Sequence, residues 1–370
     1  MANSLEINII KILDTIVTIL FVVLFTCSPC YGSTLISDII CKLELKYRNK
    51  FSQWKFCHLS MYRLDSPYVV SYRILNKLFN PEGTCTLVRE SSGDNIKISQ
   101  HLPSYLAGLW EGDGHLTFKR DKDNTIVGAT LAITFHMKDQ PLCEHLQKLL
   151  GGNIRLKTAE NACVLSFQNR ESLFKIVKLL SGCLRSPKLV KFNILIGFLN
   201  DKLDLSLSPE TADNTPLSSN SWLAGFIDAD GSFAIDYSTT AKKFRIGVRL
   251  RIEQRMIDPY SGLSYETLFL QIAEFLKCNL KISTHNVDKK YFILAATSKL
   301  SISQILDYFT KFSLFSCKHL DYLDWSMASN IWLSGKAYEP ENKIKIQDLK
   351  MGMNSKRTYY NWDHLSKLDL

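Results

Sequence analysis

The sequence predicts an α+β fold of two pseudo-symmetric repeats, each ordered helix, strand, strand, helix, strand, strand, helix (αββαββα). The main observation is a duplication: YLAGLWEGDGHLTFK at 105–119 is matched by WLAGFIDADGSFAID at 222–236. Further along, LCEHLQKLLGGNIRLK at 142–157 is matched by LFLQIAEFLKCNLKIS at 268–283. Because the matching segments keep the same order, they indicate two copies of one structural unit.

Length and composition are those of a globular protein with more than one domain. The chain has 370 residues, 46% of them hydrophobic and 22% charged, which excludes a collagen-like, coiled-coil or polytopic membrane architecture. The formal net charge of +9 is compatible with binding nucleic acid or an anionic membrane and does not choose between them. The ten cysteines are scattered, and we interpret them as reduced and mostly buried.

Residues 1–95 are predicted to be a leader that stands apart from the repeats. Its segment from Ile16 to Phe25 is almost wholly apolar. A signal-peptide core, a single membrane span and translated sequence from an upstream exon remain three open alternatives for it. The first repeat is predicted at 96–200 and the second at 220–370, joined by a polar linker at 201–219 that contains two prolines.

The duplicated motifs are predicted to form the first helix of each repeat. Pro103 suits the first helical position, and Gly114 can end the helix in the left-handed conformation. In the second repeat, Ser219 or Asn220 can cap the helix and Gly231 can end it.

The clearest strand of the sequence is predicted at 244–255 (FRIGVRLRIEQR). Its apolar residues alternate with a row of arginines at Arg245, Arg249, Arg251 and Arg255. A guanidinium row suits phosphates and guanine edges in a DNA major groove, and the alternative is a solvated sheet face. Other strand positions predicted to contact DNA are Lys119, Thr130, Thr134, Arg155, Lys157 and Lys281.

Two acids end each motif helix: Glu111 and Asp113 in the first repeat, Asp228 and Asp230 in the second. A helix C-terminus carries partial negative charge, so carboxylates there are unfavourable by several tenths of a kcal/mol. Their repetition at matching positions indicates a bound cation. Carboxylates and carbonyl oxygens are hard ligands that suit Mg²⁺.

Small residues recur four positions apart in both motif helices, at Gly108 and Gly112 and at Gly225 and Ala229. This spacing places each pair on one helix face, where two backbones can approach closely. The contact is either made within each repeat or made between the two motif helices, as in a fused dimer. The second arrangement would bring Asp113 and Asp230 together.

The segments LAGLWEGDG (106–114) and LAGFIDADG (223–231) resemble the two signatures of the LAGLIDADG homing endonucleases. The form that they resemble is the single-chain, two-repeat form encoded in organellar group I introns, over about residues 100–370. The first signature departs from the consensus at Trp110 and Glu111, and neither position is that of the metal-binding acid.

The resemblance implies that the repeats pack through the signature helices and that each lays a curved four-stranded antiparallel sheet along the DNA. It implies that Asp113 and Asp230 hold two or three Mg²⁺ ions between them, helped by the backbone carbonyls of Gly112 and Ala229. The sixth-position acids of the signatures are not the usual ligands in the family.

The family's late basic residue falls on Lys188 and Lys318, where it would order water or stabilise phosphate charge. The implied activity is a double-strand cut by a monomer in a long double-stranded DNA site, in a mitochondrion or another organelle. Unlike strand faces in the two repeats predict a non-palindromic site. The alternative function is an RNA maturase that assists splicing of its own group I intron, with or without cleavage activity, because family members with that role can keep both acids.

Overall fold

The structure is a computed structural model that describes residues 99–238, 245–286 and 289–369. These residues belong to one compact unit, Thr84–Leu370. The other unit, Met1–Gly83, and with it the apolar segment of the predicted leader, lies outside the described residues. Within the described part, no helix is both long and apolar enough to cross a bilayer.

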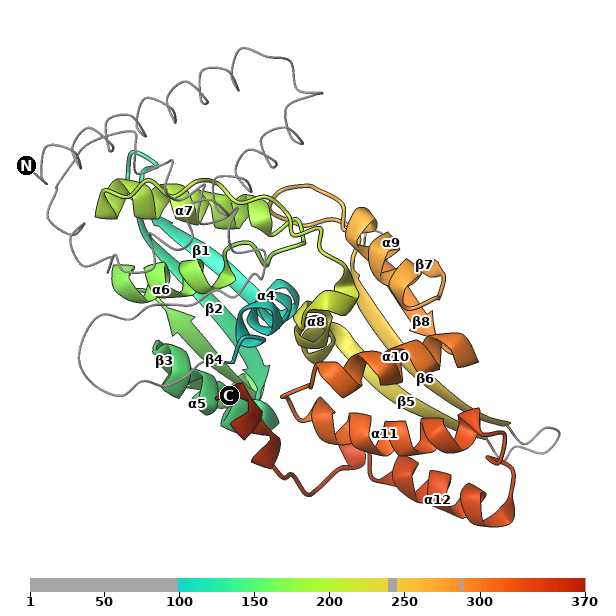
Figure 1. Cartoon of the computed structure of the whole chain (residues 1–370). Coiled ribbons are helices and arrows are strands. Elements are labelled where there is room, and N and C mark those ends of the chain that lie inside the picture. The colour runs from blue at the N-terminus through green and yellow to red at the C-terminus, as the bar shows by residue number, and fades with distance from the viewer. Residues whose placement is uncertain (1–98, 239–244, 287–288, 370) are drawn as a thin grey trace, which may run out of the picture. The chain divides into compact units, whose positions relative to one another are not determined.

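The first repeat has a four-stranded antiparallel sheet in the order β1-β2-β4-β3. Its elements, labelled as in Figure 1, are α4 (Leu102–Asp113), β1 (Gly114–Arg120), β2 (Ile126–His136), α5 (Gln140–Leu150), β3 (Asn153–Lys157), β4 (Ala162–Phe167), α6 (Arg170–Leu180) and α7 (Leu189–Leu203).

The second repeat has the same topology, with the sheet order β5-β6-β8-β7. Its elements are α8 (Trp222–Asp230), β5 (Gly231–Ser238), β6 (Arg245–Arg255), α9 (Glu266–Phe275), β7 (Leu280–Asn286), β8 (Lys289–Ala296), α10 (Lys299–Lys311), α11 (Lys318–Leu333) and α12 (Pro340–Met351). The predicted α+β fold of two repeats is confirmed. Each repeat nevertheless ends in two helices, α6–α7 and α10–α11, where the sequence predicted one, and α12 is a further addition.

Helices α4 and α8 lie side by side between the two sheets (Figure 1). Their contact requires glycine, because a Cβ atom on Gly108 would lie 1.9 Å from the carbonyl oxygen of Trp222. Gly225 has the matching relationship, with its Cβ position 1.9 Å from the carbonyl oxygen of Tyr105. The small residues therefore join the two repeats to each other, which settles the choice that the sequence left open.

Both glycines that end the motif helices are extended, so the left-handed conformation predicted for Gly114 is wrong. Gly114 has φ −86° and ψ 155°, and Gly231 has φ −88° and ψ 156°. The chain runs directly into the next strand at both places, so no reversal of direction is needed. Glycine is required by packing instead, since a Cβ atom on Gly114 would lie 2.1 Å from Cδ1 of Trp110.

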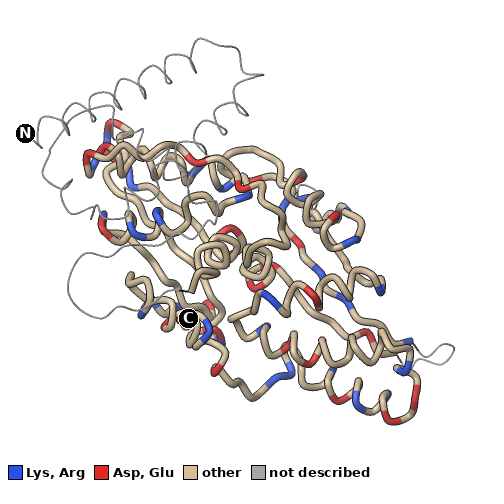
Figure 2. Tube along the Cα trace, in the orientation of Figure 1, with Lys and Arg blue, Asp and Glu red and all other residues tan. Residues whose placement is uncertain are grey.

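The linker begins later than predicted, because α7 continues to Leu203. Polar contacts hold the linker against the first repeat. The guanidinium of Arg185 forms a buried ion pair with Asp213 at 2.6 Å, and the side-chain amide of Asn193 exchanges hydrogen bonds with the backbone of Glu210. Charged side chains of both signs are interspersed along both repeats (Figure 2).

Candidate active site

Asp113 and Asp230 end helices α4 and α8, so the glycine contact between these helices brings the two carboxylates to the same end of the pair. The Asp113 side chain is exposed and that of Asp230 is half-buried. Burial, and next the negative charge of Asp113, raise the pKa of Asp230 to about 7. Desolvation by the surrounding protein also raises the pKa of Asp113, against the opposing charges of Lys318 and Lys188. Such a pair is stabilised by a cation.

The sixth-position acids are buried and have a structural role. The Glu111 carboxylate accepts hydrogen bonds from the backbone N–H groups of Arg185 and Ser186 and from the indole Nε1 of Trp222 at 2.6 Å. It thereby ties the turn before α7 to the helix pair. Burial raises the pKa of Glu111, while these hydrogen bonds oppose the rise.

Asp228 ties the turn before α11 to the helix pair in the second repeat. Its carboxylate accepts from the backbone N–H groups of Phe315 and Ser316, from the Ser316 hydroxyl, and from the Tyr105 hydroxyl at 2.7 Å. Since Trp222 and Tyr105 each belong to the opposite repeat, both acids also connect the repeats. Their oxygens are occupied by donors, which leaves Asp113 and Asp230, the last acids of the two motif helices, as the candidates for binding a cation.

Lys188 and Lys318 lie at the starts of α7 and α11 and reach the C-terminal ends of the motif helices. Nζ of Lys188 donates to the carbonyl oxygens of Gly112 at 3.0 Å and Gly114 at 2.7 Å. Nζ of Lys318 donates to the carbonyl oxygens of Asp228 and Ala229, both at 2.7 Å. Burial lowers the pKa of Lys188.

The predicted carbonyl ligands of Gly112 and Ala229 thus already have a cationic partner. Each carbonyl oxygen has a second lone pair. Nowhere in residues 99–238, 245–286 and 289–369 do three or more His, Cys, Asp or Glu side chains form a metal-binding group. Two carboxylates with nearby carbonyls nevertheless fit Mg²⁺, which keeps several waters and binds through one or two carboxylates plus substrate phosphates.

The sequence prediction missed Gln254 on β6. Its Nε2 donates to Oδ2 of Asp230 at 2.7 Å and so orients that carboxylate. A signal was present, because the alternation of β6 places Gln254 on the same face as the buried Leu250 and Ile252, where an amide is unusual. In the second repeat Gly231 pairs with Ile252, two residues before Gln254, and in the first repeat Gly114 pairs with Ile133, two residues before Phe135. The counterpart of Gln254 on β2 is therefore the buried Phe135. The two carboxylates therefore have different neighbours.

In the first repeat, the predicted DNA contacts share one sheet face. Thr130 pairs with Thr117, two residues from Lys119, and Thr134 lies further along the same face of β2. The register then places Thr134, Val164 and Arg155 in one row across the sheet. His136, Ala162 and Lys157 form the next row, in which Lys157 pairs with Glu160 at 3.0 Å.

In the second repeat, the register places Arg245, Arg249, Arg251, Arg255 and Lys281 together on one sheet face. The opposite face of β6 is buried, as the alternation predicted. Two of the arginines have acidic partners: Arg251 donates to Glu253 at 2.7 Å and Arg249 lies 3.4 Å from Asp236.

The chain resembles known proteins in sequence and in fold. It is 26% identical to the intron-encoded DNA endonuclease aI3 of Saccharomyces cerevisiae, over 75% of this chain and 76% of that protein. It is 31% identical to the intron-encoded RNA maturase bI4 of the same yeast, over 40% of this chain and 21% of the maturase. The crystal structure of the I-LtrWI LAGLIDADG homing endonuclease bound to target DNA matches with a TM-score of 0.55 and 21% identity, over 71% of this chain and all of that one. This structural likeness shows the fold.

The profile of the LAGLIDADG endonuclease family matches residues 106–198 and 223–329. The two matched ranges contain the signature parts of both motif helices, both sheets and both lysines described above. Because the two repeats are matched separately and in order, the chain belongs to the LAGLIDADG endonuclease family.

Proposed function

We propose that this chain is a site-specific DNA endonuclease that hydrolyses phosphodiester bonds in both strands of a long, non-palindromic site. The observation that carries this proposal is the pair of Asp113 and Asp230, one from each repeat, at the joined ends of α4 and α8. Relatives named as intron-encoded DNA endonucleases support it, among them aI3 of Saccharomyces cerevisiae.

Divalent metal ions, with Mg²⁺ as the expected ion, would be held by Asp113 and Asp230, with the carbonyls of Gly112 and Ala229 beside them. The chemistry that such ions supply is activation of the attacking water and charge stabilisation at the leaving oxygen. A solved relative, I-SmaMI, is described as bound to uncleaved DNA in the presence of calcium ions, which supports a divalent site. The pKa of about 7 at Asp230 also favours a cation at this place.

The other residues of the site position groups and balance charge. Gln254 orients the Asp230 carboxylate, and Lys188 and Lys318 place positive charge beside the helix ends, where a phosphate would gain negative charge. The two sheet faces would contact the DNA bases, one face for each half-site. The face of the first repeat carries Lys119, Thr130, Thr134, Arg155 and Lys157. The face of the second repeat carries Arg245, Arg249, Arg251, Arg255 and Lys281. Because the faces differ, the two half-sites should differ.

The protein would act as a monomer, since one chain supplies both repeats, and would act in the mitochondrion. Two relatives carry names that support this location, a cox1 intron-2 protein of Schizosaccharomyces pombe and the mitochondrial protein RF1 of Saccharomyces cerevisiae. The similarity to an RNA maturase supports a second candidate, assistance in splicing of a group I intron RNA.

The test is a cleavage assay on the full chain. DNA that spans the joined exons flanking the coding intron is incubated with Mg²⁺ or with EDTA, and binding to the precursor intron RNA is measured in parallel. A double-strand cut near the exon junction that requires Mg²⁺ supports the endonuclease. Tight RNA binding without any DNA cut would move the assignment to the maturase.

A further inference from the structure

We propose that a cavity beside the Asp230 half of the active site binds one backbone phosphate of the DNA target, on one side of the pseudo-twofold axis only. The cavity has a volume of about 270 Å³ and lies between the repeats. The first repeat contributes Trp110, Lys188 and Lys191, and the second contributes Gln254, Arg255 and Tyr260. This proposal rests on the proposed function, since it names a further contact with the same substrate.

The location follows from Gln254, which lines the cavity and also donates to Asp230. Lys188, which reaches the end of α4, lines it too. A group bound here therefore lies next to the reacting centre without occupying it. Arg255 connects the cavity to the sheet face that is proposed to contact DNA, because it follows Arg251 on that face.

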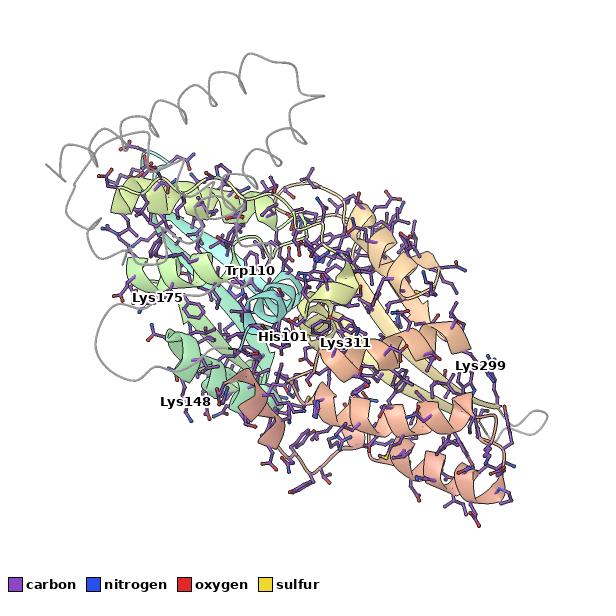
Figure 3. The ribbon with its side chains drawn as sticks, viewed as in Figure 1. His101, Trp110, Lys148, Lys175, Lys299 and Lys311 are labelled. Atoms are coloured by element: carbon purple, nitrogen blue, oxygen red, sulfur yellow. The ribbon has the colours of Figure 1, made fainter. Side chains whose placement is uncertain are left out.

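The chemistry of the walls favours an anion. Lys188, Lys191 and Arg255 bring three cationic side chains to the cavity, against one carboxylate, that of Asp258. Asp258 already accepts hydrogen bonds from the backbone N–H and the hydroxyl of Ser261, both at 2.7 Å. Trp110 also lines the cavity, and its buried Nε1 has no acceptor among the described residues. Trp110 projects from α4 (Figure 3).

The cavity is preorganised. Lys191 lies over the Tyr260 ring, with Nζ 4.5 Å from its centroid, so the ammonium is held by an aromatic ring of the other repeat. The segment that carries Tyr260 is closed by backbone hydrogen bonds from Tyr265 to Met256 and from Asp258 to Leu263. The ammonium therefore loses little freedom when an anion binds.

The counterpart positions in the other half do not repeat this chemistry. Lys191 follows Lys188 by three residues, and the residue three after Lys318 is the buried Asp321, which pairs with Arg357 at 2.9 Å. Arg255 is replaced by His136, three residues after Ile133, and Trp110 by Ile227. A phosphate site on one side only would fix the orientation of the protein on its DNA.

The test scans the target DNA with neutral methylphosphonate linkages, one phosphate at a time in both strands. Binding of each DNA is measured for the full chain, for Lys191→Met and for Lys175→Met. Lys175 is the matched control, because it is exposed on α6 and pairs with Glu171 (Figure 3). We expect one position, in one strand, where neutralisation weakens binding by roughly tenfold in the unchanged protein and in Lys175→Met, but causes no further loss in Lys191→Met. Tyr260→Leu, which keeps every charge, should reduce the effect at the same position.

A result in which no phosphate depends on Lys191, or in which two symmetry-related phosphates do, would overturn the phosphate site. If the DNA is still cut under those conditions, the proposed endonuclease function stands while this inference fails. Absence of any DNA binding or cutting would overturn both.

Discussion

The Nζ atom of Lys318 lies 2.7 Å from the carbonyl oxygen of Ala229, at the C-terminal end of α8. Lys188 has the same relationship with Gly112, at 3.0 Å, at the end of α4. Each motif helix thus ends on an ammonium group supplied by the last part of its own repeat. The positive charge offsets both the partial negative charge of the helix end and the carboxylate that follows it.

Replacement of this ammonium should affect stability and cleavage together. In Lys188→Met, the carbonyls of Trp110, Gly112 and Gly114 lose a shared donor. We expect the free energy of unfolding in urea to fall by about 1–3 kcal/mol. The cleavage rate should fall by at least about 100-fold, because a charge next to the reacting phosphate is lost. Lys175→Met should change neither quantity, and full cleavage activity in Lys188→Met would contradict the role given to this lysine.

Replacing either acid of the second motif by asparagine should change the free energy of unfolding, downward for Asp228 and upward for Asp230. Asp228→Asn places an amide among the donors of Phe315, Ser316 and Tyr105, so the free energy of unfolding should fall by about 2 kcal/mol. Asp230→Asn removes a carboxylate that is desolvated and lies near the like charge of Asp113, with Gln254 as a donor in place of the several donors around Asp228, so near pH 8 without metal it should stabilise the fold by about 1–3 kcal/mol. Urea unfolding of both variants checks this. A lower free energy of unfolding in Asp230→Asn would contradict the repulsion inferred between Asp113 and Asp230.

The contact between α4 and α8, which joins the two repeats, should not tolerate an added methyl group. Gly108→Ala places a Cβ atom against the backbone of Trp222, so α4 and α8 must separate. We expect a loss of about 3 kcal/mol or more in the free energy of unfolding. Gly197 on α7 is the control, because a Cβ atom there has no neighbour within 4 Å, and Gly197→Ala should stabilise the helix by about 0.5–1 kcal/mol. Equal stability of the two variants would show that the helices are not in backbone contact.

Metal binding should depend on pH through Asp230. Its pKa of about 7 exceeds the ordinary value of 3.8, so the folded state holds an extra proton between those values. Without metal, the contribution of Asp230 to stability should therefore be greatest below pH 3.8, decline as the pH rises from there to about 7, and change little above that. A metal ion must displace this proton, so its apparent affinity should rise by up to about tenfold per pH unit below 7 and level off above. Calorimetry in two buffers of different ionisation enthalpy measures the released proton, and Asp230→Asn should release fewer protons than the unchanged protein.

Much of this architecture could be predicted because the duplication repeats the same patterns twice. Alternation alone assigned Ile246 and Arg245 to opposite faces of β6. The roles of Glu111 and Asp228 could not be assigned in detail, because their donors come from residues 74 or more positions away or from the other repeat. The left-handed conformation predicted for Gly114 was wrong, because a helix that is followed at once by a strand needs no left-handed residue at its end. The extra helix α12 had no counterpart in the first repeat to reveal it.

The most direct test of the central claim is strand cleavage by the two motif-acid variants. The claim is that Asp113 and Asp230, one from each repeat, form one shared catalytic centre. Double-strand cleavage in Mg²⁺ and DNA binding are measured for the full chain, Asp113→Asn and Asp230→Asn. We predict that each substitution alone abolishes the double-strand cut while DNA binding is retained. A variant that lacks either carboxylate and still cuts both strands at the normal rate would contradict the account.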